Sequence, residues 1–173
     1  RQEFATEQKH RILWQLIETQ EFEQFLHTRY IGQKRFSIEG CEALLPLVDA
    51  LVVSGSEMGV EEMVIGMSHR GRLNVLAHIL HKPYEVILAD FEGAASGLGA
   101  EDEGDVKYHQ GYSHDFVTGS GRKMHLSLSP NPSHLELVNP VIEGMVQAKQ
   151  DHLHDAGRSR VVPIQIHGEA AFT

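Results

Sequence analysis

The chain has 173 residues, of which 41% are hydrophobic and 23% are charged, and these values are ordinary for a globular domain. Its formal net charge of −9 argues against a protein that binds nucleic acid, because basic residues would have to dominate one face. No apolar run approaches the roughly 20 residues of a membrane span, and the single cysteine, Cys41, excludes an internal disulfide and fits a reducing compartment.

The first third of the chain is predicted to be helical. Apolar residues recur at helical spacing through residues 4–29 with an interruption near Thr19, so we expect two short amphipathic helices there. A further helix is predicted from about residue 42 to 53. We interpret residues 1–33 as an N-terminal helical segment and residues 34–173 as part of a larger domain.

A strand, a polar loop and a helix are predicted to follow one another after this region. The apolar run Met63–Met67 predicts a buried strand, and the loop behind it carries His69, Arg70 and Arg72. Apolar residues then resume at helical spacing, at Leu73, Leu76, Ala77 and Leu80. Cations at the N-terminus of a helix suit a phosphate group. For a loop taken alone, a basic surface turn is the simpler interpretation.

The remaining elements alternate between helix and strand. Residues 92–105 are small or acidic and lack an apolar period, which predicts a surface loop and not a dinucleotide-binding loop. In chain order the other predicted elements are a helix at 84–91, a strand at 124–128, a helix from about 135 to 152 with an interruption at Pro140, and a strand at 161–166. The alternation predicts an α/β fold with a mainly parallel sheet flanked by helices. No helix follows the last strand, so we expect a fragment of a longer chain.

Polar residues follow three of the predicted strands, and the carboxyl ends of parallel strands meet at one edge of a sheet. A fourth segment, Lys107-Tyr108-His109, is a candidate for the same edge. The residues delivered there are His69, Arg70 and Arg72, then Asn131, Ser133 and His134, then His167 and Glu169. Together they offer cations for phosphate or carboxylate, imidazoles for proton transfer, and one carboxylate for a metal.

Each of these residues also has a purely structural interpretation. Either arginine could pair with a surface acid, Ser133 could cap a helix, and His109 could be a core histidine whose ring is hydrogen-bonded. Glu169 near a helix start would be favoured by the helix dipole without any metal. The chain carries no nucleophile elbow, Walker loop or catalytic triad order, which favours chemistry supplied by a bound cofactor.

Several motifs resemble, in order, the decarboxylating first component of the 2-oxoglutarate dehydrogenase complex, a thiamine diphosphate enzyme. They are KRFSIEG (34–40), GMSHRGRLNVL (66–76), GDVKYH (104–109), NPSHLE (131–136) with NPV (139–141), and HGEAAF (167–172). The resemblance implies that residues 34–173 are part of the thiamine diphosphate-binding domain, cut short at the C-terminal side. It also implies that the chain is inactive alone, since the family's cofactor lies between domains of two subunits.

The resemblance further implies roles for individual residues. Arg70 would contact the diphosphate, and His69 and His109 would be active-centre histidines. His109 would also bind the substrate, as would Ser133. The remaining cofactor contacts would come from Leu135, Glu169, Ala170 and Ala171, with Glu169 as the Mg²⁺ ligand.

Glu169 departs from the family's pattern, which places an aspartate at this position. The extra methylene adds ~1.5 Å of reach, and Mg²⁺ requires near-octahedral ligands at ~2.0–2.1 Å. We therefore expect magnesium affinity to be retained but weakened, and the change Glu169→Asp to alter the magnesium dependence of activity.

The resemblance implies oxidative decarboxylation of 2-oxoglutarate in the tricarboxylic acid cycle, with the succinyl group passing to the lipoyl group of dihydrolipoyl succinyltransferase. A homodimer is implied, in the bacterial cytoplasm or the mitochondrial matrix. Lys107-Tyr108-His109 matches the 2-oxoglutarate type better than a relative that acts on 2-oxoadipate. The open alternatives are that relative, a non-catalytic homologue, and another enzyme such as a phosphate-handling transferase.

Overall fold

The structure is a computed structural model that describes residues 3–93, 107–118, 121–132, 134–168 and 171. Its elements, in chain order, are α1 (Thr6–Arg29), α2 (Leu44–Glu57), β1 (Glu62–Met67), α3 (Arg72–Asn74), the π-helix η1 (Val75–Ile79), α4 (Tyr84–Phe91), β2 (Tyr112–Val117), β3 (Lys123–Leu128), α6 (Val138–His152) and β4 (Val161–Ile166). Among the described residues, no helix is both long and apolar enough to cross a membrane.

The four strands form one sheet in the order β2-β3-β1-β4. Strand β1 runs parallel to β3 and to β4, whereas β2 runs antiparallel to β3. This arrangement confirms the predicted α/β fold with a mainly parallel sheet. Pro163 lies within β4, at the edge of the sheet in the described part of the chain, where the ladder hydrogen bond that proline cannot donate is not needed.

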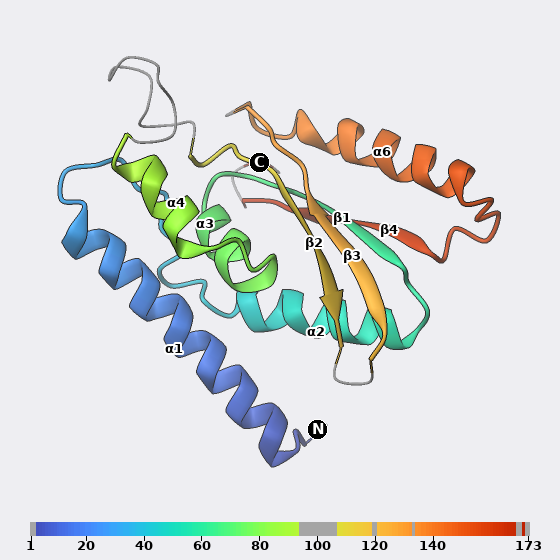
Figure 1. Cartoon of the computed structure of the whole chain (residues 1–173), viewed down its shortest axis with the longest axis horizontal. Coiled ribbons are helices and arrows are strands. Elements are labelled where there is room, and N and C mark those ends of the chain that lie inside the picture. Colours follow the sequence, from blue (N-terminus) through green and yellow to red (C-terminus); the bar gives the residue numbers. More distant parts are fainter. Residues whose placement is uncertain (1–2, 94–106, 119–120, 133, 169–170, 172–173) are drawn as a thin grey trace.

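Helices cover both faces of the sheet (Figure 1). On one face α6 packs against β1 and β4 through a small cluster: Val64, Val138, Ile142, Val146 and Val161. A Cβ at Gly66 would lie 2.5 Å from Ile142 Cγ1, so the glycine lets α6 approach the sheet closely. The larger core on the other face joins the sheet to α2, η1 and α4, and it includes Phe22 and Leu26 of α1.

The predicted break near Thr19 is wrong, because α1 is one continuous helix of 24 residues. Thr19 is fully buried, and its hydroxyl donates a hydrogen bond to the Gln15 carbonyl at 2.7 Å. A threonine can satisfy its hydroxyl in this way within a helix, so its presence does not end the element. The N-terminal segment is therefore a single long helix.

The predicted helix from residue 135 begins later, at Val138. Glu136 precedes it with a φ of +67°, a left-handed conformation that a helix interior does not contain. Pro140 lies in the first turn of α6, where backbone N–H groups have no intrahelical acceptor, so it does not interrupt the helix.

The other predicted elements are present, with three differences. The helix predicted at about 42–53 is α2, which begins at Leu44 and continues to Glu57. The strands at 63–67, 124–128 and 161–166 and the helix at 84–91 are present, each within one residue of its predicted bounds. The segment 75–79 is a π-helix, and strand β2 was not predicted. Within the expected surface loop, residues 94–105 lie outside the described residues.

Candidate functional site

The three parallel strands end at the same edge of the sheet, as predicted. Residues from all three strand ends line a small crevice there that encloses about 10 Å³. The lining residues are Ser68 and His69 after β1, Asn131, Pro132, His134, Leu135, Glu136, Val138 and Asn139 after β3, and Ile166 and His167 at β4.

The segment that carries His109 reaches the same edge from the other side. Strand β2 begins where β3 ends, because Tyr112 pairs with Leu128 in the antiparallel ladder. The Asn131 N–H donates to the His109 carbonyl at 3.2 Å. The Nε2 atom of His109 is buried and has no hydrogen-bond partner among the described residues. The fourth predicted segment thus adjoins the crevice, although His109 does not line it.

An aromatic contact links the loop after β1 to this segment. The ring centroids of His69 and Phe36 lie 3.8 Å apart, and those of Phe36 and Tyr108 lie 5.1 Å apart. Tyr108 is buried, and burial raises the pKa of its hydroxyl to about 12, which keeps it protonated at neutral pH. The Phe36 ring therefore contacts both the loop that carries His69 and the segment that carries His109.

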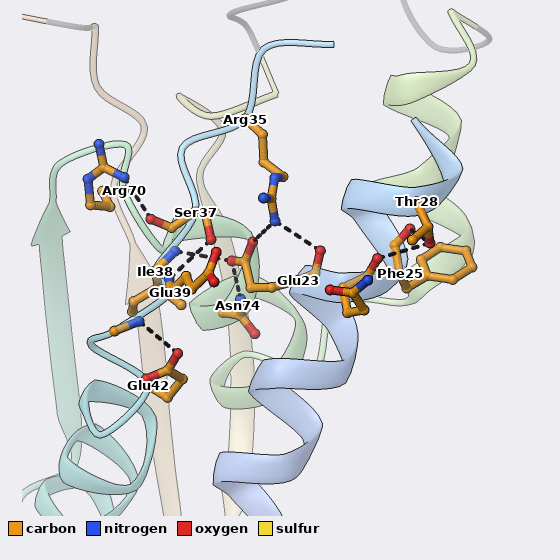
Figure 2. A network of polar contacts seen from close by, with 12 residues as sticks. Glu23, Phe25, Thr28, Arg35, Ser37, Ile38, Glu39, Glu42, Arg70 and Asn74 are labelled. Atoms are coloured by element: carbon orange, nitrogen blue, oxygen red, sulfur yellow. Dashed lines mark hydrogen bonds and ion pairs between the residues drawn. The ribbon is translucent and has the colours of Figure 1, made fainter. Parts of the chain in front are cut away.

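Arg70 does not line the crevice in this structure. Its side chain is exposed, and one Nη1 hydrogen bond of 2.8 Å goes to the Ser37 carbonyl (Figure 2). The guanidinium therefore lies beside the link that joins α1 to α2. Its assignment as the diphosphate contact stays a prediction.

A buried carboxylate holds that link in place (Figure 2). Glu23 of α1 forms an ion pair with Arg35 at 2.9 Å and accepts hydrogen bonds from the Ile38 N–H at 3.3 Å and the Asn74 amide at 2.7 Å. Its side chain is 9% exposed. Through this one residue, α1 is connected to the segment behind the β1 loop.

Sequence reasoning assigned no role to Glu136, although it lines the crevice. Its carboxylate forms an ion pair with His167 Nδ1 at 2.6 Å and accepts a hydrogen bond from the Asn139 amide at 2.5 Å. These contacts join the loop after β3 to the end of β4. No local pattern could have indicated the ion pair, because His167 is 31 residues away from Glu136 in sequence.

Three of the predicted site residues, Ser133, Glu169 and Ala170, lie outside the described residues. Leu135 lines the crevice and is 55% exposed, which leaves it accessible to a ligand. The Ala171 N–H donates to the Gly168 carbonyl at 3.1 Å. The described part of the chain contains no group of three or more histidine, cysteine or acidic side chains that could hold a metal ion.

A larger cavity of about 210 Å³ lies elsewhere, between α1, α2, η1 and β2. It is lined by polar and aromatic side chains, among them His78 and His81, and none of the predicted site residues belongs to it. Cavity volume alone would therefore point away from the strand ends. The convergence of four polar segments is the stronger indicator of a site, because ligands of open α/β sheets bind at this edge.

Comparison with known proteins gives close relatives over nearly the whole chain. It is 51% identical over 173 residues to the 2-oxoglutarate dehydrogenase E1 component of Rickettsia conorii, covering 98% of this chain and 18% of that protein. It is 49% identical over 170 residues to that of Cupriavidus necator, with the same coverage. The mitochondrial 2-oxoglutarate dehydrogenase of Dictyostelium discoideum is 46% identical over 171 residues, covering 98% of this chain and 17% of that protein.

No protein-family model matches the chain. The chain spans about 18% of the length of the first two curated relatives, so the similarity concerns one segment of much longer proteins. That segment folds into an α/β unit whose strand ends carry the predicted motifs. The chain is therefore a homologue of one segment of the 2-oxoglutarate dehydrogenase E1 component.

Proposed function

We propose that this chain supplies the diphosphate-binding part of the active site in an enzyme that decarboxylates 2-oxoglutarate with thiamine diphosphate and Mg²⁺. The observation that carries the proposal is the convergence of His69, His134 and His167 on one crevice at the parallel strand ends. The names of the relatives, 2-oxoglutarate dehydrogenase E1 component, support the proposed reaction and substrate.

The residues around the crevice have the chemistry that such a cofactor requires. Arg70 is an exposed cation within the same loop as His69, and Leu135 presents an exposed apolar side chain at the crevice. These two residues, with Ala170 and Ala171, would hold the cofactor, and Glu169 would bind its Mg²⁺. When bound, thiamine diphosphate supplies the nucleophilic carbon and the electron sink that decarboxylation of a 2-oxo acid needs.

The chain's own side chains would bind the substrate and handle protons. Nε2 of His109 is buried and has no partner among the described residues, and a substrate carboxylate would supply that partner. His69 would act at the reacting centre, and Ser133 would donate its hydroxyl to the substrate. Imidazoles are suited to both tasks, since they can donate a hydrogen bond and exchange a proton near neutral pH.

The proposal extends to the partners of the complete protein. The succinyl group would pass to the lipoyl group of a dihydrolipoyl succinyltransferase, as a step of the tricarboxylic acid cycle. The complete protein would be a homodimer. It would work in the bacterial cytoplasm or, in a eukaryote, in the mitochondrial matrix, in line with the bacterial and mitochondrial relatives.

Cofactor binding tests the proposal. Titration of the complete protein with thiamine diphosphate and Mg²⁺ should show saturable binding, and Arg70→Met should raise the Kd about tenfold or more, because a hydrogen bond to a charged group is lost. Arg158, which is also exposed, lies in the turn before β4 and serves as the matched control through Arg158→Met. Equal Kd values for the two variants would refute the role of Arg70, and absence of binding by the unmodified protein would refute the proposed function.

A further inference from the structure

Arg72, to which the sequence assigns no role of its own, donates hydrogen bonds to several segments at the edge of the sheet where the parallel strands end. Its side chain is fully buried, at 0% exposure. Nη1 donates hydrogen bonds to the carbonyls of Gln110 at 2.7 Å and Ser129 at 3.0 Å. Nη2 donates to the Met67 carbonyl at 2.7 Å and to the side-chain oxygen of Asn131. One guanidinium thus serves four acceptors.

These acceptors belong to three segments that are far apart in sequence. Met67 ends β1, Ser129 and Asn131 follow β3, and Gln110 precedes β2. A guanidinium is planar and its N–H groups point in fixed directions. Hydrogen bonds from one such group therefore fix the positions of the three segments relative to one another.

A second contact shows how closely two of these segments approach. A Cβ at Gly111 would lie 2.6 Å from the Pro130 Cδ atom and 2.7 Å from the Leu128 carbonyl oxygen. Only a glycine fits there without displacing the end of β3. The carbonyl of Gln110 is thereby kept within reach of Arg72.

The charge of Arg72 is not neutralised by a side chain of the described residues. All four acceptors are neutral, and Nε is buried without a partner in that part of the chain. Burial lowers the pKa of the guanidinium to about 10, still far above neutral pH. A buried cation without a carboxylate is a costly way to stabilise a fold. The arrangement is explained better by the geometry that it imposes.

That geometry includes the candidate site residues. His109 directly precedes Gln110, and its carbonyl accepts the Asn131 N–H, so Arg72 holds both ends of this contact. The Gln110 side chain is fixed in addition by Lys82 and by Asp90, the latter at 2.8 Å. Met67, the third anchor, lies two residues before His69.

We propose that Arg72 is a positioning residue of this site, which sets His109 and Asn131 in register with the end of β1 without touching the substrate. The inference rests on the proposed function for its catalytic consequence. It predicts that the planar arrangement of N–H donors in the guanidinium, and not its positive charge, is what turnover requires.

Two substitutions in the complete enzyme separate the effect of the N–H donor arrangement of Arg72 from the effect of its charge. Arg72→Lys keeps the charge but cannot serve four acceptors, and Arg72→Met removes both. We expect both variants to lower kcat for 2-oxoglutarate by about 10- to 100-fold with KM changed by less than about threefold, since small misplacements of catalytic groups affect turnover most. Arg122→Lys is the matched control, because Arg122 also donates to two carbonyls, those of Ser56 and Glu57 at 3.2 Å, but at the opposite end of β3. Its kcat should stay within about twofold.

Hydrogen exchange of the backbone gives a readout that does not depend on the reaction. In Arg72→Lys, exchange should accelerate at residues 107–111 and 129–131 but not in α6, and Arg122→Lys should leave both segments unchanged. Retention of kcat by Arg72→Lys, or acceleration spread evenly over the fold, would overturn the inference. If the unmodified enzyme does not turn over 2-oxoglutarate, the proposed function fails, and the exchange pattern alone decides whether Arg72 positions these segments.

Discussion

At His109 a backbone hydrogen bond fixes the main chain, while the ring nitrogen Nε2 has no partner within the described part of the chain. The carbonyl accepts the Asn131 N–H, and the neighbours on both sides are buried or bonded: Tyr108 lies in the core and Gln110 is held by Lys82 and Asp90. A buried imidazole nitrogen without a partner costs free energy unless a ligand satisfies it. This is the state expected of a side chain whose missing hydrogen-bond partner is supplied by a bound substrate.

The change His109→Ala should therefore damage turnover and not cofactor binding. We expect kcat of the complete enzyme with 2-oxoglutarate to fall by about 10²–10⁴-fold, the usual effect of removing a proton-transfer group. The Kd for thiamine diphosphate should change by less than about threefold. The exposed His152 at the end of α6 provides the control through His152→Ala. A loss of cofactor affinity as large as the loss of turnover would contradict the assignment.

At the scale of elements, α1 is joined to the site region by one buried carboxylate. Glu23 binds Arg35, the Ile38 backbone and Asn74, so it links α1 to the segment before α2 and to α3 (Figure 2). Phe22 and Leu26 add apolar contacts on either side of it. The helix is thus part of the same core as the sheet.

Replacement of Glu23 by alanine should destabilise the fold strongly. The change removes the carboxylate that pairs with the half-buried Arg35 and accepts from the buried Asn74 amide, and breaking a buried ion pair costs about 3–5 kcal/mol. The Glu61–Arg160 pair, whose side chains are 51% and 39% exposed, is the control, and Glu61→Ala should cost about 1 kcal/mol or less. Urea titration gives the free energy of unfolding for each variant. Equal losses would contradict the expectation that the buried Glu23 network stabilises the fold more than the exposed Glu61–Arg160 pair does.

The elements also show which parts of the fold can be read from the sequence. Buried parallel strands such as β1 are continuous apolar runs, and these were predicted within one residue. Strand β2 alternates half-buried Tyr112, His114 and Phe116 with exposed residues, a weaker period-2 signal that was missed. The supposed break at Thr19 failed because tertiary packing of α1 overrides the low helix propensity of threonine.

For the site, the sequence predicted which segments converge but not how they are held together. His69, His134 and His167 meet as expected because the carboxyl ends of parallel strands lie at one edge of the sheet. The Glu136–His167 pair and the four hydrogen bonds of Arg72 join residues from separate segments at the edge. Such contacts depend on the three-dimensional placement of side chains, which no local pattern encodes.

At the scale of the whole molecule, two imidazoles that line the larger cavity, those of His78 and His81, make stability depend on pH. Desolvation lowers the pKa of His78 and of His81. A neighbouring imidazole lowers each pKa further: that of His81 acts on His78, and that of His114 acts on His81. Glu18 opposes both shifts. In the unfolded chain these rings take up protons at a higher pH than in the folded protein.

The contribution of these two histidines to the free energy of unfolding should therefore be fully present above the ordinary histidine pKa of 6.5. It should be lost as the pH falls from there through the lowered pKa values of the folded protein. The midpoint of thermal unfolding, measured at pH 7.5 and at pH 5.5, should drop on acidification, and His78→Gln should reduce this drop. The exposed His10 on α1 is the control, and His10→Gln should leave the drop unchanged. An unchanged drop in His78→Gln would contradict the role of His78.

The most direct test of the central claim is turnover by the complete protein. With an artificial electron acceptor, it should reduce the acceptor at a rate that requires 2-oxoglutarate, thiamine diphosphate and Mg²⁺ together, and His109→Ala should abolish most of this rate. Acceptor reduction that is absent, or that persists when 2-oxoglutarate or thiamine diphosphate is omitted, would contradict the claim that the strand-end crevice belongs to a 2-oxoglutarate-decarboxylating site.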